Sequence, residues 1–292
     1  MNEIPDDFAF LSDDIIHDVL QFVYFEQLMV RLNLQSIPTG DPPVGGRWGE
    51  IAHKFRVFKL VGNEIEEYRL DGRSESFTAA ANGRNVVAVN SLNIDWNTDF
   101  NQINHLAADA YELLEVYCDV IPKEFLQSLG NRFTSIIWLN RNEGQTEIDF
   151  LKRQLKSPHL RILECGSSVL TRPEFIDLLV DFVKKKNFET LISTSLECLS
   201  PEVFLAAYES WIQRRDREHL QSSICAQSST EDLRKLTARI PNFSWNQRIE
   251  GFRTEWSYSE RHPTADHYEM LMSYNEWSFV PSDVKNLSIT LQ

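Results

Sequence analysis

The sequence predicts an α/β protein, in which a short helical start is followed by strands and helices that alternate along most of the chain. Residues 4–34 carry apolar side chains at intervals of three and four, which is the period of a helix with one buried face. From about residue 113, segments of the form apolar-x-x-apolar-x-apolar lead through polar turns into amphipathic helix patterns. One strand–helix unit cannot bury its apolar face alone. The units are therefore expected to stack, with a parallel sheet on one surface and helices on the other.

The helical start is assigned to residues 1–54. A loop rich in proline and glycine, residues 37–46, interrupts it, because proline removes an amide donor and glycine favours open conformations. The apolar spacing resumes near Trp48. The apolar positions before the loop are Phe8, Leu11, Ile15, Ile16, Val19, Leu20, Val23, Leu28 and Leu32.

Residues 55–105 have a different pattern, in which short β-prone runs are separated by turn residues. Asn63, Asp71-Gly72 and Asn82-Gly83 supply the turn chemistry. We therefore expect short strands and tight turns that lead into the repeats.

The repeats are assigned to residues 106–292. Their strands are expected to begin at Leu113, Phe133, Leu160, Phe188 and Leu220. The separations are 20, 27, 28 and 32 residues, an irregular period near that of leucine-rich-repeat units. The predicted architecture is therefore an irregular leucine-rich-repeat-like solenoid of strands and helices that follows the helical start.

Three helices of the repeats have recognisable starts. Residues 171–174, Thr-Arg-Pro-Glu, have the form of a capping box in front of an apolar stripe. Residues 200–201, Ser-Pro, begin a second helix, and Ser228 with Glu231 is expected to cap a third helix that runs to about Ile240.

The pattern changes after Pro241 into aromatic-rich strand candidates. These are residues 252–258 and 269–274, with Trp256, Trp277 and Phe279 available to cover the last repeat. We expect this segment to act as a cap, because a stack of repeats must close its terminal apolar face against water.

The charge of the chain argues against nucleic-acid binding. Lys and Arg number 29 against 43 for Asp and Glu, which gives a net charge of −14. The basic runs at residues 184–186 and 214–217 fall where predicted helices end, and cations there meet the negative end of the helix dipole. Acidic residues follow Met1 and no apolar run reaches the length of a membrane span, so a cytoplasmic or nuclear protein is expected.

No catalytic residue, metal ligand or cofactor is expected, and the chain is not predicted to be an enzyme. It lacks the motifs GxGxxG, GxxxxGK[ST], GxSxG and HExxH. Asp13 and His17 lie four apart on the predicted first helix and are expected to form a solvated ion pair. His262 and His267 have no third ligand nearby, and a zinc site needs three or four.

The four cysteines are far apart and contain no CxxC pair, so reduced and mostly buried thiols are expected. Cys118 and Cys165 are assigned to the third apolar position of their repeats, where Trp138 stands in another repeat. Both are therefore expected to be small core residues.

The N-terminal region resembles an F-box, a pattern that opens with Leu-Pro and an acidic pair, continues into an apolar helix and closes near a tryptophan. Residues 4–7, Ile-Pro-Asp-Asp, keep the proline, whereas residues 11–14, Leu-Ser-Asp-Asp, keep the helix spacing, and Arg47-Trp48 follows. The resemblance implies that this helix binds the adaptor subunit of a cullin-RING ubiquitin ligase. The side chains that would be buried there are Leu11, Ile15, Ile16, Val19 and Leu20.

A wider likeness is to divergent nematode proteins with an F-box-like start and an irregular repeat domain. It rests on the order of an Ile-Pro-x-x-Phe start, a tryptophan near residue 50, the segment 150–160 and His262-Pro263. It implies a subunit whose repeats recruit a protein for ubiquitination. Two alternatives stay open: an interaction or scaffold protein whose degenerate F-box binds no ligase, and an unrecognised enzyme, which predicts a deep pocket with titratable residues.

Overall fold

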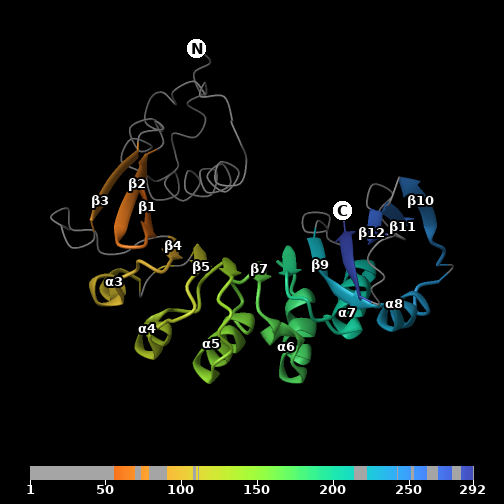
Figure 1. The fold of residues 1–292 in the computed structure, drawn as a ribbon, viewed down its shortest axis with the longest axis horizontal. Coiled ribbons are helices and arrows are strands. Elements are labelled where there is room, and N and C mark those ends of the chain that lie inside the picture. The colour runs from red at the N-terminus through yellow and green to blue at the C-terminus, as the bar shows by residue number, and fades with distance from the viewer. Residues whose placement is uncertain are drawn as a thin grey trace, which may run out of the picture.

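The computed structural model describes residues 56–69, 74–78, 91–107, 110, 112–213, 222–241, 243–250, 253–261, 269–277 and 284–291. Over these residues the chain is a mixed α/β protein built on one large sheet, with its helices on one side of the strands (Figure 1). The predicted α/β class is confirmed. The expected helical start, residues 1–54, lies outside the described residues.

The centre of the sheet is parallel, and its strands lie side by side in chain order. They are β1 (Arg56–Val61), β4 (Ser91–Ile94), β5 (Leu113–Val116), β6 (Ser135–Trp138), β7 (Ile162–Cys165), β8 (Thr190–Ser193) and β9 (Ser222–Ser229).

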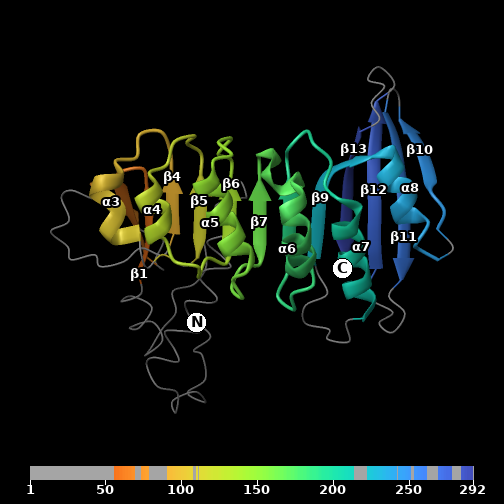
Figure 2. The same ribbon diagram turned by 90° about the horizontal axis from the view of Figure 1, so that it is seen from below.

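One helix connects each pair of neighbouring strands from β4 to β9. These helices are α3 (Phe100–Ala107), α4 (Lys123–Ser128), α5 (Gln145–Leu155), α6 (Pro173–Val183) and α7 (Pro201–Gln213). The 3-10 helix η3 (Ser168–Thr171) precedes α6, and α8 (Thr230–Thr237) follows β9. The helices cover the same face of the sheet (Figures 1 and 2).

Antiparallel strands extend the sheet at both ends. Next to β1 are β2 (Glu64–Arg69) and β3 (Ser74–Thr78), and next to β9 are β13 (Val284–Leu291), β12 (Glu269–Trp277), β11 (Arg253–Arg261) and β10 (Asn246–Glu250). The turn from β1 to β2 contains the expected Asn63, preceded by Gly62, whose φ of 57° suits a residue without a side chain. The aromatic-rich strands expected near residues 252–258 and 269–274 are β11 and β12.

A row of apolar side chains crosses the parallel strands at the core of the molecule. Its members pair in register and are at most 1% exposed: Leu60, Leu92, Leu114, Ile136, Leu163, Leu191 and Ile224. Trp138 is also fully buried and stacks on Phe150 of α5, with ring centroids 5.3 Å apart. Burial of each such side chain stabilises the fold by about 1.5–3 kcal/mol. This row therefore contributes much of the free energy that packs the helices on the sheet.

The alignment of the strands corrects the predicted repeat. Leu113 is the first residue of β5, but the other predicted starts, Phe133, Leu160, Phe188 and Leu220, lie two residues before their strands. The consecutive leucines at 113 and 114 let the apolar template fit in two registers. The pairing of β5 with β6 selects the register in which Leu114 lies opposite Ile136.

Cys118 is consequently not equivalent to Trp138, contrary to the prediction. Val116 lies opposite Trp138, and Trp138 lies opposite Cys165, so only Cys165 occupies the predicted position. The residues in register from β4 to β9 are Leu92, Leu114, Ile136, Leu163, Leu191 and Ile224, at separations of 22, 22, 27, 28 and 33 residues.

The predicted helix α6 is present, but its capping box is not. Thr171 belongs to η3, and its hydroxyl oxygen lies 2.7 Å from the Ser168 carbonyl oxygen and 2.6 Å from Glu197 Oε2. Arg172 is the N-cap, and its side chain makes no capping hydrogen bond. The threonine is unavailable because the preceding 3-10 turn uses its hydroxyl.

The cap of α8 is shifted by one residue from the prediction. Ser229, not Ser228, accepts a hydrogen bond at its Oγ from the amide of Asp232 at 3.0 Å. The helix ends at Thr237 rather than near Ile240. Ser228 is 1% exposed and belongs to β9, where a buried strand position replaces the expected cap.

Two cationic side chains each bind the end of the preceding helix. Arg153 in α5 donates to the carbonyl oxygens of Leu126 and Leu129 at 2.7 and 3.0 Å, at the end of α4. Lys185, just after α6, donates to the carbonyl oxygen of Leu155 at 2.8 Å, at the end of α5. The last carbonyls of a helix have no partner within it, so these cations satisfy them.

The basic run at residues 184–186 therefore lies at a helix end, as predicted. Lys184 is the C-cap residue of α6, and Lys185 binds the end of α5. The other basic run, residues 214–217, lies outside the described residues.

Candidate protein-interaction surface

The face of the parallel sheet opposite the helices is the candidate site. Successive side chains of a strand point to opposite faces, so the residues between the buried apolar positions point away from the helices. Four of them are in register on neighbouring strands: Glu115, Ile137, Glu164 and Ile192. We call these four residues the central row. Each is half-buried, and no described helix covers this face of β5–β8 (Figure 1).

Two further apolar side chains flank the central row. Ile162 lies on β7 at the row nearer the amino ends of the strands, and Leu139 directly follows β6 at the opposite end. Both are half-buried. Leu139 leans toward Gly166, since a Cβ atom added to that glycine would lie 3.1 Å from Leu139 Cδ2. The face therefore presents several branched apolar side chains on a rigid sheet.

The acidic members give this face a negative character. Glu115 accepts a hydrogen bond from Asn93 Nδ2 at 2.9 Å and one from the Tyr117 hydroxyl at 3.4 Å, which holds its carboxylate in place. Burial raises the pKa of Tyr117, and the negative charges of Glu115 and Glu164 raise it further. Both carboxylates therefore act on the same part of the surface.

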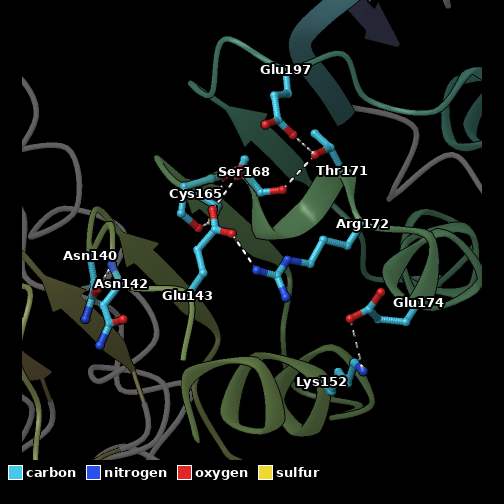
Figure 3. A network of polar contacts seen from close by, with 11 residues as sticks. Asn140, Asn142, Glu143, Lys152, Cys165, Ser168, Thr171, Arg172, Glu174 and Glu197 are labelled. Atoms are coloured by element: carbon cyan, nitrogen blue, oxygen red, sulfur yellow. Dashed lines mark hydrogen bonds and ion pairs between the residues drawn. The ribbon is translucent and has the colours of Figure 1, made fainter. Parts of the chain in front are cut away.

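Polar contacts join the loops that follow β6, β7 and β8 (Figure 3). Glu143 forms an ion pair with Arg172 at 2.6 Å and accepts a hydrogen bond from the Ser168 hydroxyl. Those two donors hold the pKa of Glu143 below its ordinary value, with Ser168 the larger cause. Thr171 contacts Glu197 from the next loop. These contacts fix the loops along the carboxyl edge of the strands, next to the central row.

A buried amide supports the same edge. Asn140 is fully buried, and its side-chain oxygen accepts a hydrogen bond from the amide of Asn142 at 2.5 Å. Asn142 in turn donates from Nδ2 to Glu147 at 3.2 Å, at the start of α5. Such a side-chain turn gives the loop a defined conformation without regular secondary structure.

No protein-family model matches the chain, and no curated protein or solved structure is significantly similar to it. The functional assignment therefore rests on the geometry of its side chains. Among the described helices, none has the length and apolar character that crossing a bilayer requires.

The thiols are not arranged as nucleophiles. Burial raises the pKa of Cys118, Cys165, Cys198 and Cys225, and the thiolate is the reactive form. Cys118 and Cys165 are buried, as predicted. Cys198 and Cys225 are only half-buried, which corrects the expectation of mostly buried thiols. Cys225 stands on the helix-free face because its strand continues the register of Ile192.

An open polar hollow of about 430 Å³ lies beside α5. Its lining residues are Asn131, Asp149, Lys152, Arg153 and Lys156. Arg153 is already bound to the carbonyl groups at the end of α4, so the hollow is part of the junction between α4 and α5. In the portion of the chain that the structure describes, no three His, Cys, Asp or Glu side chains gather as a metal site would require.

Several residues singled out from the sequence lie outside the described residues. They are the adaptor-binding candidates Leu11, Ile15, Ile16, Val19 and Leu20, and the pairs Asp13 with His17 and His262 with His267.

Sequence reasoning did not single out the central row, although a signal for it exists. Ile137, Glu164 and Ile192 each lie between the last two positions of the predicted apolar template, and Glu115 does so in the corrected register of β5. An isoleucine there does not fit a solvated position. A strand register was needed to show that these residues line up across the sheet.

Proposed function

We propose that the chain is a protein-interaction module, an irregular leucine-rich-repeat-like solenoid that binds a partner protein on the helix-free face of its parallel sheet. The observation that carries the proposal is the set of partly exposed apolar side chains on that face, Ile137, Leu139, Ile162 and Ile192. Exposed apolar side chains grouped on one face are typical of a site that another molecule covers.

The arrangement of the strands supports a repeat architecture. Neighbouring parallel strands follow one another along the chain, with their helices on one side (Figure 2). The sheet bends, and its ends rise on the side away from the helices (Figure 1). Stacked repeats that curve in this way offer an extended concave surface to a partner.

The use that we propose for this module is substrate recruitment in a cullin-RING ubiquitin ligase. The F-box-like start would bind the adaptor subunit through an apolar helix face that includes Leu11, Ile15 and Val19, whose spacing suits a helix in a groove. The sheet face would bind the protein to be ubiquitinated. The alternative is an interaction or scaffold protein that binds no ligase.

Adaptor binding is tested by a pull-down of the purified full chain with the adaptor subunit. Ile15→Asp combined with Val19→Asp is expected to abolish capture. The control is Gln127→Asp combined with Ala238→Asp, which adds the same charge at exposed positions of the repeat domain. Circular dichroism must first show that all three chains fold. Failure of the wild-type chain to capture the adaptor would favour the scaffold alternative.

Binding by the sheet face is tested with a photo-crosslinking amino acid. Placed at position 137, it should yield a discrete adduct with a second protein in extracts of the cells that express the chain. At position 177, an exposed site on α6, it should not yield that adduct. No adduct from position 137, or the same adducts from both positions, would contradict the proposed site.

A further inference from the structure

We infer that the central row recognises a basic amphipathic helix of the partner protein, lying across the strands with two cations on Glu115 and Glu164 and apolar side chains on Ile137 and Ile192. This inference rests on the proposed protein-binding function and adds the chemistry and geometry of the partner. It follows from the alternation of acidic and apolar side chains along one register line of four strands.

The spacing of the row matches a helix. Neighbouring strands lie about 4.8 Å apart, so Glu115 and Glu164, two strands apart, are separated by about 9.6 Å along the row. Seven residues of an α-helix rise about 10.5 Å, and three or four residues rise about 4.5–6 Å. A helix with cations at i and i+7 therefore meets both carboxylates. Apolar residues at i+3 or i+4 and at i+10 or i+11 then meet Ile137 and Ile192.

An extended segment matches the row less well. Its side chains return to the same face every two residues, about 6.6–6.8 Å apart. That step falls between one strand spacing and two. An extended partner would thus place alternate side chains between the acidic and apolar positions. The helix is favoured by its length per turn, which at about 5.4 Å lies near the strand spacing.

The charges select a cationic partner. Glu164 makes no ion pair with a cation in the described part of the chain, and Glu115 accepts hydrogen bonds from Asn93 and Tyr117. A carboxylate has about four acceptor positions, so it can accept from several donors at once, a partner's Lys or Arg among them. The net charge of −14 favours approach of the same kind of partner.

The test is a displayed library of helical peptides selected on the purified full chain. The positions i, i+3, i+7 and i+10 of one helix face are randomised, and the remaining positions are fixed. Binders of the wild-type chain are expected to carry Lys or Arg at both i and i+7. Glu115→Lys combined with Glu164→Lys should reverse the preference to Asp or Glu at those two positions.

Affinity is then measured with one selected peptide by fluorescence anisotropy. Glu115→Gln combined with Glu164→Gln should weaken its binding about 3- to 10-fold, because two exposed ion pairs are lost. Glu124→Gln combined with Glu209→Gln, exposed positions on α4 and α7, should leave binding unchanged. The difference in affinity between the wild-type chain and the variant with glutamine at positions 115 and 164 should shrink at high salt, because salt screens the ion pairs.

The outcomes separate this inference from the function on which it rests. Selection of no helix, or of helices without the paired cations, would overturn the partner chemistry, and an adduct from position 137 would still uphold protein binding by this face. Absence of that adduct would remove the function itself. Charge-reversed preference in the double lysine variant, together with the adduct, would support both.

Discussion

Lys185 Nζ lies 2.8 Å from the carbonyl oxygen of Leu155 and 2.5 Å from that of Ser157. A single ammonium group just after α6 thus donates hydrogen bonds to two carbonyl groups at the end of α5. Arg153 makes the equivalent contacts to the repeat before it. The carbonyl groups at the ends of α4 and α5 are thus each bound by a cation from the next helix or from the residues just after it. Part of the stability of α4 and of α5 therefore comes from the helix that follows.

Substitution of Lys185 by Met should lower the free energy of unfolding by about 1–3 kcal/mol, because two carbonyl groups lose a charged donor. Lys184→Met is the matched control, since Lys184 is exposed and makes no comparable contact with the neighbouring repeat. Urea unfolding of both variants measures the difference. Equal losses in the two variants would show that the contact between repeats contributes little.

The advantage of wild type over Lys185→Met should grow with pH. Burial lowers the pKa of Lys185 from 10.5 to about 8, although Asp181 opposes the change. Between these values the unfolded chain binds more protons than the folded chain, so stability from this group rises with pH. Unfolding of both proteins at pH 7.5 and pH 10 tests the sign. A difference that falls over this window would contradict the assigned desolvation.

The ion pair of Glu143 and Arg172 should contribute only about 0.2–1 kcal/mol, because both side chains are partly exposed. A double-mutant cycle with Glu143→Gln and Arg172→Met measures the coupling. Its Glu143 arm should be more costly than its Arg172 arm, since Glu143 also accepts from Ser168. Additive effects in the cycle would mean that the loop is held by the serine alone.

Ser229→Ala should destabilise the protein by about 1 kcal/mol, because the amide of Asp232 would lose its cap. Ser229→Gly should destabilise the protein by only a few tenths of a kcal/mol, since glycine is itself accepted at an N-cap. Thermal unfolding of the two variants gives the order. A glycine variant less stable than the alanine variant would show that the backbone of β9, rather than the cap, responds to the change.

The same serine shows where sequence reasoning is accurate and where it stops. Periodicity and proline signals predicted α6 and α7, and both helices begin at a proline, Pro173 and Pro201. Ser228 and Ser229 are chemically equivalent as caps, and only the end of β9 decides between them. Thr171 likewise fits a capping box, but its hydroxyl binds the Ser168 carbonyl group within a 3-10 turn. The spacing of apolar residues does not predict that turn.

The candidate surface depends still more on tertiary structure. In the sequence, the segment 150–160 stands out only as a family likeness, yet Arg153 and Gln154 donate to the carbonyl oxygens of Leu126 and Gly130, in α4 and just after it. Glu115 and Ile192 are far apart in the chain, and only the strand register brings them into one line. A sequence motif describes one strand and its helix, whereas this surface is formed by four strands together.

Gly166→Ala should separate binding from stability. The new Cβ atom would lie 3.1 Å from Leu139 Cδ2, the far end of a flexible side chain, so Leu139 can move by a few tenths of an ångström. Replacement of glycine also reduces the entropy of the unfolded chain, a gain of about 0.4–1 kcal/mol that offsets the strain. The free energy of unfolding should therefore stay within about 1 kcal/mol of wild type.

Binding of the helix selected on the wild-type chain should weaken, because Leu139 borders the central row. In a Leu139→Ala background the glycine substitution should have no further effect on binding; an undiminished effect there would show that the methyl group acts through the backbone and not through Leu139.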